Sequence, residues 1–298
     1  MTTSLSFAEL DTATAPLRPA DPLPYPPHST QKIEKYFYDF WKHLPSSEIA
    51  LIKRKYLPIF WTNYYLSETE KRPCPRLQQF IETQLPKSDH YFTIVQHADG
   101  IAERLPPSSL IFSCGGLGDV PIPLLCAPHP LPSNQERDLL ASFVGIIQSP
   151  FNDRTGIRTK MRDMLGEEPG IRIIEARNDT TLFRAMMSCS VFALCPRGYG
   201  KTSFRLYEAI QMGAIPVYIH DDPWLPYQSE LDWNSFSVLC PAKEMPTLAK
   251  RLKNFSPEKI ERMQMTLREV YEKYFTFEAT CNYILRVLKR SAYNDVDP

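Results

Sequence analysis

The chain has 298 residues, enough for one large or two ordinary domains, and its 43% hydrophobic and 23% charged residues are typical of a soluble globular protein. Lysine plus arginine equals aspartate plus glutamate, 34 of each, so no overall field points to nucleic acid or to an anionic membrane. Any anion site must therefore be local, and no stretch approaches the ~18 continuous apolar residues that a membrane-spanning helix needs.

The cysteines show no pairing pattern. None belongs to a CxxC motif, several lie in apolar runs and their number is odd, so we interpret them as reduced core residues rather than disulfide or zinc ligands. The seven cysteines are Cys74, Cys114, Cys126, Cys189, Cys195, Cys240 and Cys281.

No apolar segment follows the amino terminus, and the sequence therefore predicts a cytoplasmic or otherwise soluble protein.

The first half of the chain is predicted to form a tail and a small α/β domain. Residues 1–30 are rich in proline and lack hydrophobic periodicity, which predicts a disordered or extended tail. Residues 31–128 combine an amphipathic aromatic helix with three apolar segments typical of strands, which indicates a smaller domain. The helix is expected over 31–44, the strands over 90–96, 109–114 and 120–126, and a proline-rich linker over 126–136.

The second half alternates regularly between short apolar runs and helical patterns. Alternation of this kind predicts a parallel sheet with right-handed crossovers, so residues 129–256 should form a Rossmann-like domain that binds ligands beyond the carboxyl ends of its strands. Residues 257–298 should form two helices that brace the domains, plus a short tail. The strands are expected over 141–147, 171–176, 191–195 and 214–219, and the final helices over 257–274 and 277–290.

The segment "CPRGYGKTSFRLYEAIQMGAIPVYI" (195–219) contains the GKT tripeptide that ends a P-loop. A Walker A loop also needs a glycine five residues before the glycine–lysine pair, and that position is Cys195. Pro196 removes a backbone donor as well. An ATPase loop is therefore rejected, and the segment is interpreted as a strand, a glycine turn and a helix.

The start of this helix has the features of a phosphate site. Thr202 or Ser203 can cap it, and the free N–H groups at a helix amino end carry partial positive charge that suits a diphosphate. The turn contains Gly198, and formal positive charge gathers at the same end. The cationic residues are Arg197, Lys201 and Arg205.

Glu208 lies roughly a turn and a half into the helix, where a carboxylate could accept hydrogen bonds from two ribose hydroxyls. The alternative is that Arg205 and Glu208 form an ordinary surface pair at i,i+3 spacing, worth only ~0.2–0.5 kcal/mol. The basic residues, the glycines and the capped helix after a buried strand together favour a nucleotide-diphosphate site.

The longer segment "CPRGYGKTSFRLYEAIQMGAIPVYIHDDPWLPY" (195–227) resembles the signature of exostosin-like glycosyltransferases, and 143–165, 89–100 and 118–125 are more loosely similar to the same family. The resemblance implies an α/β fold of the GT-B type, with two Rossmann-like domains facing a central cleft and 31–128 on the acceptor side. It also implies transfer of a sugar from a UDP-sugar to a hydroxyl of a glycan acceptor, commonly with inversion.

The resemblance also assigns roles to single residues. Ser203 and Arg205 would contact the diphosphate and Glu208 the ribose. Asp222 would lie near the donor sugar, although it could equally be a turn aspartate before a proline.

Arg154 and Arg158 are further candidates for pyrophosphate contacts; the alternative is a solvated helix start. Such sites need no metal, and the only Asp-x-Asp, at 295–297, lies in the last residues. We therefore expect no cofactor and no metal.

An inverting transfer needs a base that takes the acceptor proton, together with positive charge that stabilises the departing UDP. The base should come from the first domain, and Asp99 is the first choice because a carboxylate before a glycine at a strand end can reach a cleft. His97 could be the base or a core histidine. Asp119 could be the base or a turn cap.

The sequence does not identify the donor sugar, and a neutral sugar such as xylose or galactose is mildly preferred because no extra cation for glucuronate is evident. The acceptor would be an oligosaccharide or a glycoprotein glycan, with no nucleic acid partner. Two alternatives are a catalytically inactive glycan- or nucleotide-binding module of the same fold and a GT-B enzyme that uses another nucleotide.

Overall fold

The computed structural model describes residues 4–19, 24–26, 29–67, 72–130, 136–149 and 153–290. Its described residues divide into two compact units. Unit 1 contains the chain up to residue 25, residues 30–122 and the chain from 277, and unit 2 contains 26–29 and 123–276. Each unit is described by itself.

Unit 1 is built on a four-stranded parallel sheet in the order β1-β2-β3-β4. The strands are β1 (Lys55–Tyr56), β2 (Tyr91–Val95), β3 (Leu110–Ser113) and β4 (Val120–Pro121). The helices are α1 (Phe7–Thr14), α2 (Ile33–Lys42), α3 (Ser46–Ile49), α4 (Trp61–Ser67), α5 (Pro75–Gln84) and α11 (Phe277–Lys289), with a 3-10 turn at Ala15–Leu17.

Aromatic side chains fill the space between α2 and the sheet. Ile33, Phe37 and Trp41 recur at four-residue spacing on one face of α2 and are buried. The Phe37 ring meets the rings of Tyr56 on β1 and Phe92 on β2 edge-on, with centroids 5.2 and 6.0 Å away. The predicted amphipathic helix is therefore confirmed.

The prediction of a disordered or extended tail over residues 1–30 is wrong for residues 6–17. Ser6 caps α1, and its side chain and that of Glu9 form a reciprocal capping box. Leu10 and Leu17 are buried in the core of unit 1. The Ser-x-x-Glu signature lies in the printed sequence, but the high proline content of the segment concealed it.

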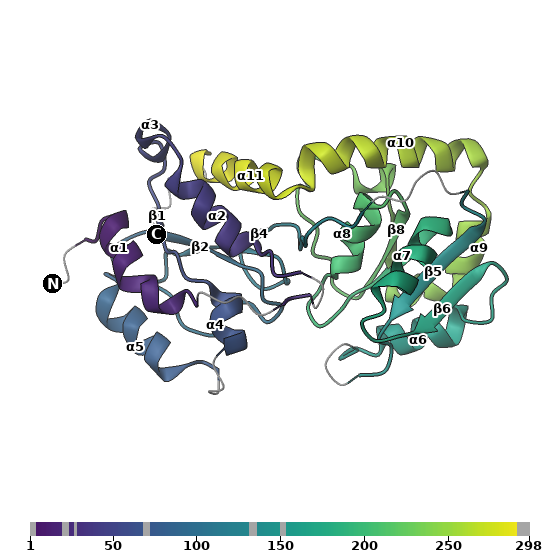
Figure 1. Ribbon diagram of the computed structural model, residues 1–298, viewed down its shortest axis with the longest axis horizontal. Coiled ribbons are helices and arrows are strands. Elements are labelled where there is room, and N and C mark those ends of the chain that lie inside the picture. The colour runs from purple at the N-terminus through teal and green to yellow at the C-terminus, as the bar shows by residue number, and fades with distance from the viewer. Residues whose placement is uncertain are drawn as a thin grey trace. The chain divides into compact units, whose positions relative to one another are not determined.

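Unit 2 is built on a five-stranded parallel sheet in the order β6-β5-β7-β8-β9, of which β5, β6 and β8 are labelled in Figure 1. The strands are β5 (Leu139–Gly145), β6 (Ile171–Glu175), β7 (Ser190–Pro196), β8 (Ile215–His220) and β9 (Val238–Pro241). The helices are α6 (Ile157–Leu165), α7 (Thr180–Cys189), α8 (Phe204–Gln211), α9 (Leu248–Lys253) and α10 (Pro257–Tyr274), with 3-10 turns at Trp233–Ser235 and Ala242–Thr247.

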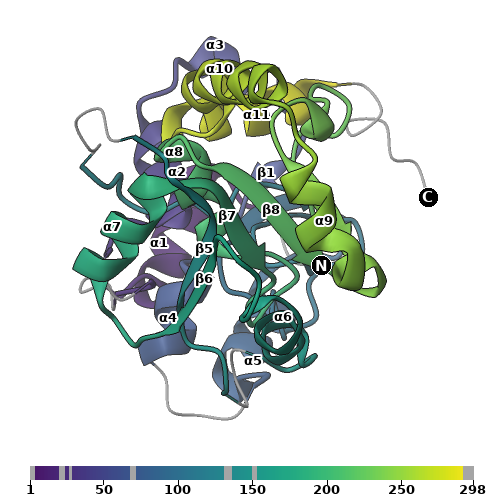
Figure 2. The ribbon, with the colours of Figure 1, turned by 90° about the vertical axis from the view of Figure 1, so that its right-hand side faces the viewer.

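This strand order makes unit 2 a doubly wound sheet. The chain first moves from β5 outward to β6 and then returns past β5 to β7, so the direction of winding reverses between β5 and β7. Figure 2 shows α7 and α8 on one face of the sheet and α6 and α9 on the other. A ligand crevice is expected beyond the carboxyl ends of β5 and β7.

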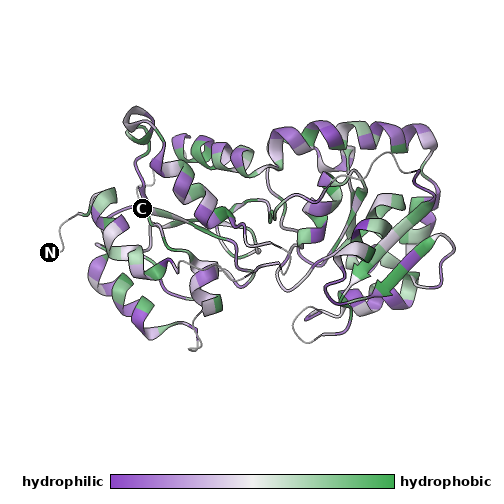
Figure 3. Cartoon of the chain, in the orientation of Figure 1, coloured by the Kyte–Doolittle hydropathy of each residue, from purple (hydrophilic) through white to green (hydrophobic). Residues whose placement is uncertain are grey.

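The hydrophobic pattern explains why these strands were predictable. β5 and β6 are mostly green in Figure 3, whereas the long helix α10 is largely purple with a narrow apolar stripe. Continuous apolar runs are typical of parallel strands that are covered on both faces, as in β8, whose six residues are all buried. The α/β class with a Rossmann-like second domain is confirmed.

The unit boundary differs from the predicted domain limits of 31–128 and 129–256. Unit 2 begins its main segment at residue 123, and the strand predicted over 120–126 is shorter and ends at Pro121. The two final helices match the predicted bounds closely, but α10 belongs to unit 2 and α11 to unit 1.

Two further features follow from the described residues. All seven cysteines are free and five of them are buried, as expected for reduced core residues. None of the helices in the described ranges combines the length and the apolar character needed to cross a bilayer.

Candidate functional site

A pocket of about 170 Å³ lies at the point in unit 2 where the winding reverses. Gly145 at the end of β5 and Asn178 after β6 form part of its wall. The pocket is also lined by an aromatic ring from α7, that of Phe183, and by two charged side chains from α8, those of Arg205 and Glu208. The crevice expected from the topology is thus present, and the predicted helix supplies two of its side chains.

Arg205 is the central cation of the pocket. Ser203 caps α8 and accepts a hydrogen bond from the Arg205 backbone N–H, and the guanidinium donates to the carbonyl oxygen of Val144. The guanidinium carbon lies 4.1 Å from the centre of the Phe143 ring and 5.7 Å from that of Phe183. Its Nε is buried and has no hydrogen-bond partner among the described residues. Burial lowers the pKa of Arg205, which leaves a desolvated cation with one unused donor.

Arg158 is a second buried cation beside the first. Its Nη1 donates to the carbonyl oxygen of Ile146 at 2.8 Å and its Nε to that of Arg197 at 3.2 Å. Burial and the nearby Arg205 lower the pKa of Arg158 to about 9, against the opposing effect of Asp153. The side chain is still protonated at neutral pH. Since carbonyl groups carry no net charge, two adjacent arginines leave this end of unit 2 suited to an anion.

Gly145 allows Arg205 to approach the end of β5. A Cβ atom placed on Gly145 would lie 2.6 Å from Nη2 of Arg205, closer than such contacts occur. The guanidinium can occupy this place because residue 145 has no side chain.

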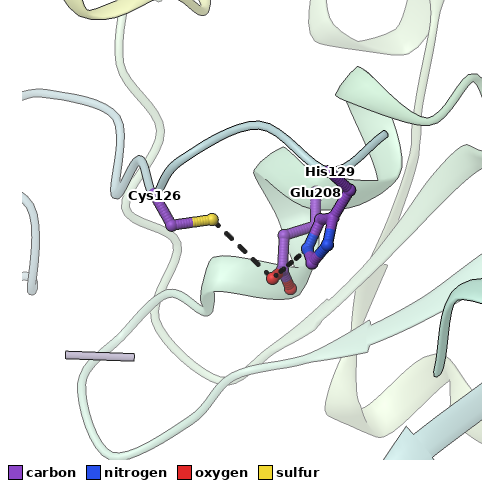
Figure 4. A group of neighbouring side chains, drawn as sticks. All are labelled: Cys126, His129 and Glu208. Carbon is purple, nitrogen blue, oxygen red and sulfur yellow. Dashed lines mark hydrogen bonds and ion pairs between the residues drawn. The ribbon is translucent and has the colours of Figure 1, made fainter. Parts of the chain in front are cut away.

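Glu208 does not form the surface pair with Arg205 that the sequence left open. Its side chain is 7% exposed, and its Oε1 lies 2.9 Å from Nε2 of His129. The thiol of Cys126 also donates to Oε1, at 3.7 Å, and Figure 4 shows both side chains pointing at this oxygen. Burial and the Glu208 carboxylate raise the pKa of the Cys126 thiol.

His129 is a site residue that sequence reasoning missed. The guanidinium Nε of Arg184 donates to its Nδ1 at 3.1 Å, so Nδ1 must be the acceptor and Nε2 carries the hydrogen directed at Glu208. The backbone of His129 is held by both ends of the Gln211 side-chain amide, at 3.1 and 2.8 Å. Nothing local distinguishes this histidine in a proline-rich stretch that reads as a linker.

Cys126, His129 and Glu208 are also a possible metal-binding group, since one ligand atom from each lies within 4.8 Å of the others. The neighbours do not fit a cation. A histidine that binds metal through Nε2 normally donates from Nδ1 to an acceptor, whereas Nδ1 here accepts from a positively charged arginine. The predicted absence of a metal stays a prediction.

The other predicted cations are engaged in ion pairs. Arg197 donates from Nη1 to Asp221 at 2.6 Å and from Nε to the carbonyl oxygen of Gly200 at 3.0 Å. Lys201 pairs with Asp222 at 2.6 Å. The structure therefore separates the predicted cluster: Arg205 lines the pocket, while Arg197 and Lys201 are partly neutralised.

The remaining donor-site candidates lie around the glycine turn. The Gly198 amide donates to the carbonyl oxygen of Thr202 at 2.9 Å, and the Thr202 hydroxyl is buried without a partner in the described structure. Arg154 is exposed and stacks on the ring of Tyr199 at 3.8 Å. Arg154 thus lies outside the lining of the pocket.

Two of the candidate bases lie at the carboxyl end of β2 in unit 1. The His97 ring is buried between Tyr25, on which it stacks, and Tyr65, which it meets edge-on. The Asp99 carboxylate is 35% exposed and lies 3.7 Å from the guanidinium of Arg72. This accessibility favours Asp99 over His97 as a group that can meet an acceptor.

Asp119 has a structural role. Its Oδ2 accepts a hydrogen bond from the Ile111 backbone N–H at 2.7 Å, and its own N–H donates to the Ile111 carbonyl at 2.9 Å. The carboxylate closes the turn between β3 and β4, in line with the turn-cap alternative. The Asp-x-Asp at 295–297 lies outside the described residues.

Comparison with known proteins finds a family model that matches the part of the chain containing this site. Residues 114–255 match the family model of the exostosin GT47 domain, which includes all five strands of unit 2. Two relatives come from Arabidopsis thaliana. A probable glycosyltransferase is 30% identical over 139 residues, 47% of this chain and 26% of that protein. The probable β-1,4-xylosyltransferase IRX10L is 30% identical over 161 residues, 50% of this chain and 38% of that protein.

A probable glucuronosyltransferase from Oryza sativa subsp. japonica is 31% identical over 178 residues, 53% of this chain and 41% of that protein. The chain thus spans well under half the length of these relatives. Among solved structures, TarM gives a TM-score of 0.40 at 11% identity, covering 57% of this chain and 39% of that one. Over residues 114–255 the chain is thus similar to the exostosin GT47 domain and to relatives that are named as glycosyltransferases.

Proposed function

We propose that this protein transfers a sugar from a UDP-sugar to a hydroxyl group of a glycan acceptor. The observation that carries the proposal is the pocket of unit 2, where Arg205 and Arg158 face the same space and have backbone carbonyls as their side-chain hydrogen-bond partners. A diphosphate would supply the negative charge that these two cations lack.

In this proposal the nucleotide lies along the start of α8. The N–H groups at the start of α8 and the unused Nε of Arg205 would bind the diphosphate, and the buried hydroxyl of Thr202 offers another donor. Glu208 would accept a hydrogen bond from the ribose. Asn178 and the ring of Phe183 offer an amide and an aromatic surface to the base.

The transfer itself would be a single displacement. The acceptor oxygen forms its bond to C1 of the sugar while the bond from C1 to the UDP oxygen breaks, and the acceptor proton passes to a carboxylate. Asp99 is the proposed base and inversion at C1 the expected outcome. Charge that develops on the departing UDP would be stabilised by Arg205 and Arg158, so activity should persist in a chelator such as EDTA.

A neutral donor sugar fits the surroundings best. Relatives of this chain carry the names xylosyltransferase and glucuronosyltransferase. A glucuronate would need a cation beside the sugar, and Lys201, near the proposed sugar position, is already paired with Asp222. Xylose or galactose is therefore the proposed class, and an oligosaccharide or a glycoprotein glycan the proposed acceptor.

Two measurements test the proposal. Calorimetric titration with UDP, GDP and ADP should show the tightest binding for UDP. A panel of UDP-sugars assayed for UDP release, with and without oligosaccharide acceptors, should then identify one neutral sugar whose turnover rises with acceptor. Binding of UDP without turnover on any donor would instead support a non-catalytic binding module.

A further inference from the structure

Arg205 and Glu208 lie three residues apart on α8, a spacing at which arginine and glutamate commonly pair. In the described structure they are turned to other partners. The Glu208 carboxylate contacts His129 and Cys126, while the Arg205 guanidinium reaches Val144 at the end of β5. A direct pair would neutralise the cation that a phosphate needs, so the arrangement that separates the two charges has a functional consequence.

His129 holds the carboxylate in its present direction. Its side chain is 1% exposed, and its Nε2–H meets Oε1 of Glu208 at 2.9 Å. Arg184 fixes the tautomer through the 3.1 Å contact to Nδ1. The ring of Phe183 packs against the imidazole with centroids 5.4 Å apart and also lies 5.7 Å from the Arg205 guanidinium, so one ring contacts both groups.

We propose that His129, oriented by Arg184, is a positioning residue that draws Glu208 away from Arg205. Arg205 then keeps its charge for a phosphate, and Glu208 keeps its place as a hydrogen-bond acceptor in the pocket. The inference rests on the proposed function, because it assumes that the pocket receives a nucleotide diphosphate. It assigns a role to two residues outside the exostosin-like signature segment 195–227.

Binding of inorganic pyrophosphate, measured by calorimetry, tests the first half of this role because the probe has no ribose. In His129→Ala, Glu208 is released toward Arg205, and pyrophosphate affinity should fall about tenfold. Adding Glu208→Gln to this variant should restore most of the affinity, since an uncharged amide cannot neutralise the guanidinium. His129→Gln keeps an N–H donor and should stay within about threefold of the wild type.

Uridine tests the second half because it has a ribose and no phosphate. His129→Ala should weaken uridine binding several-fold, and Glu208→Gln in the double variant should not rescue it. Rescue of pyrophosphate binding but not of uridine binding by Glu208→Gln would not arise from general loss of structure. His43→Ala, at an exposed histidine of unit 1, and Arg172→Ala, at an exposed position of β6, are the matched controls.

Three results would overturn the inference: unchanged pyrophosphate affinity in His129→Ala, an equal loss in His129→Ala and in the double variant, or no difference between alanine and glutamine at position 129. Should His129→Ala not fold, His129→Gln and Arg184→Met carry the test. The first should bind pyrophosphate like the wild type and the second more weakly, and the reverse order would contradict the role. Failure of the wild type to bind UDP would instead refute the proposed function.

Discussion

The two units both place an arginine at the carboxyl ends of parallel strands, but they surround it differently. In unit 1, Arg72 lies over the ring of Tyr65 and beside His97 and the carboxylate of Asp99. In unit 2, Arg205 meets aromatic rings and a carbonyl, and its neighbouring carboxylate is held by a histidine. Similar topology therefore yields two environments: one in which the cation accompanies a carboxylate, and one in which it contacts aromatic rings and a carbonyl at the wall of a pocket.

The largest expected effect concerns the carboxylate of unit 1. If Asp99 takes the acceptor proton, Asp99→Asn should lower kcat by ~10²–10⁴ because the amide cannot accept that proton. UDP affinity should stay unchanged, since the nucleotide is proposed to lie in unit 2. Steady-state kinetics and UDP titration of the same preparation check this. Turnover near that of the wild type would remove Asp99 as the base.

The free energy of unfolding should depend on pH through a buried carboxyl group of unit 1. Burial raises the pKa of Glu34 in unit 1 to about 7, against hydrogen bonds from Gln96 and Thr62. Because this carboxyl binds its proton more tightly in the folded state than in the unfolded one, unfolding free energy should fall by up to about 3 kcal/mol between pH 4.5 and 7. Glu34→Gln should remove that decline.

Urea unfolding of both proteins at pH 5 and pH 8 measures the difference, with exposed Glu82→Gln as the control. A gap between wild type and Glu34→Gln that does not change with pH would show that Glu34 titrates normally. UDP affinity should not follow this pH dependence, since Glu34 belongs to unit 1.

The contrast between the arginines can be tested directly. Arg205→Met removes the proposed charged hydrogen bonds to phosphate and should raise the Kd for UDP about 10- to 100-fold. Arg72→Met should change it by less than about threefold, because Arg72 belongs to the other unit. Similar losses in both variants would break the comparison, since they would place the nucleotide beside both arginines.

The smallest expected effect on UDP affinity comes from Gly145, the residue beside which the Arg205 guanidinium lies. Gly145→Ala puts a methyl carbon only 2.6 Å from the present position of Nη2 of Arg205, and the displaced guanidinium should bind UDP about three- to tenfold more weakly. If the methyl group acts only through the guanidinium, the same substitution should have no further effect in Arg205→Met. An additive loss in the double variant would indicate a different cause.

Much of unit 2 could be predicted from sequence because its signals are local. Apolar runs, a capped helix and short connections placed β5 to β8 and the start of α8 within a few residues of their observed bounds. In unit 1, β1 has two residues and α1 begins in a proline-rich segment, so periodicity could not reveal them. β9 and α9 were likewise not anticipated.

In the candidate site, too, the sequence could predict only those residues that belong to one local pattern. Arg205 and Glu208 were found because their helix follows a glycine turn, a pattern contained in one segment. His129 and Arg184 were missed because they are 79 and 24 residues from Glu208, and only the fold brings them together. The separation of Arg197 and Lys201 into ion pairs also depended on Asp221 and Asp222, whose directions no sequence pattern specifies.

The buried hydroxyl of Thr202 and the Nε of Arg205 have a consequence for motion. A buried polar atom without a partner costs about 1–3 kcal/mol, and both atoms lie at the start of one helix. The first turn of α8 is therefore where the ligand-free protein should open most readily, and a bound anion would close it. When an anion binds, amide hydrogen exchange should slow more in this first turn than elsewhere in unit 2. Exchange at a single turn would then report whether the pocket is occupied.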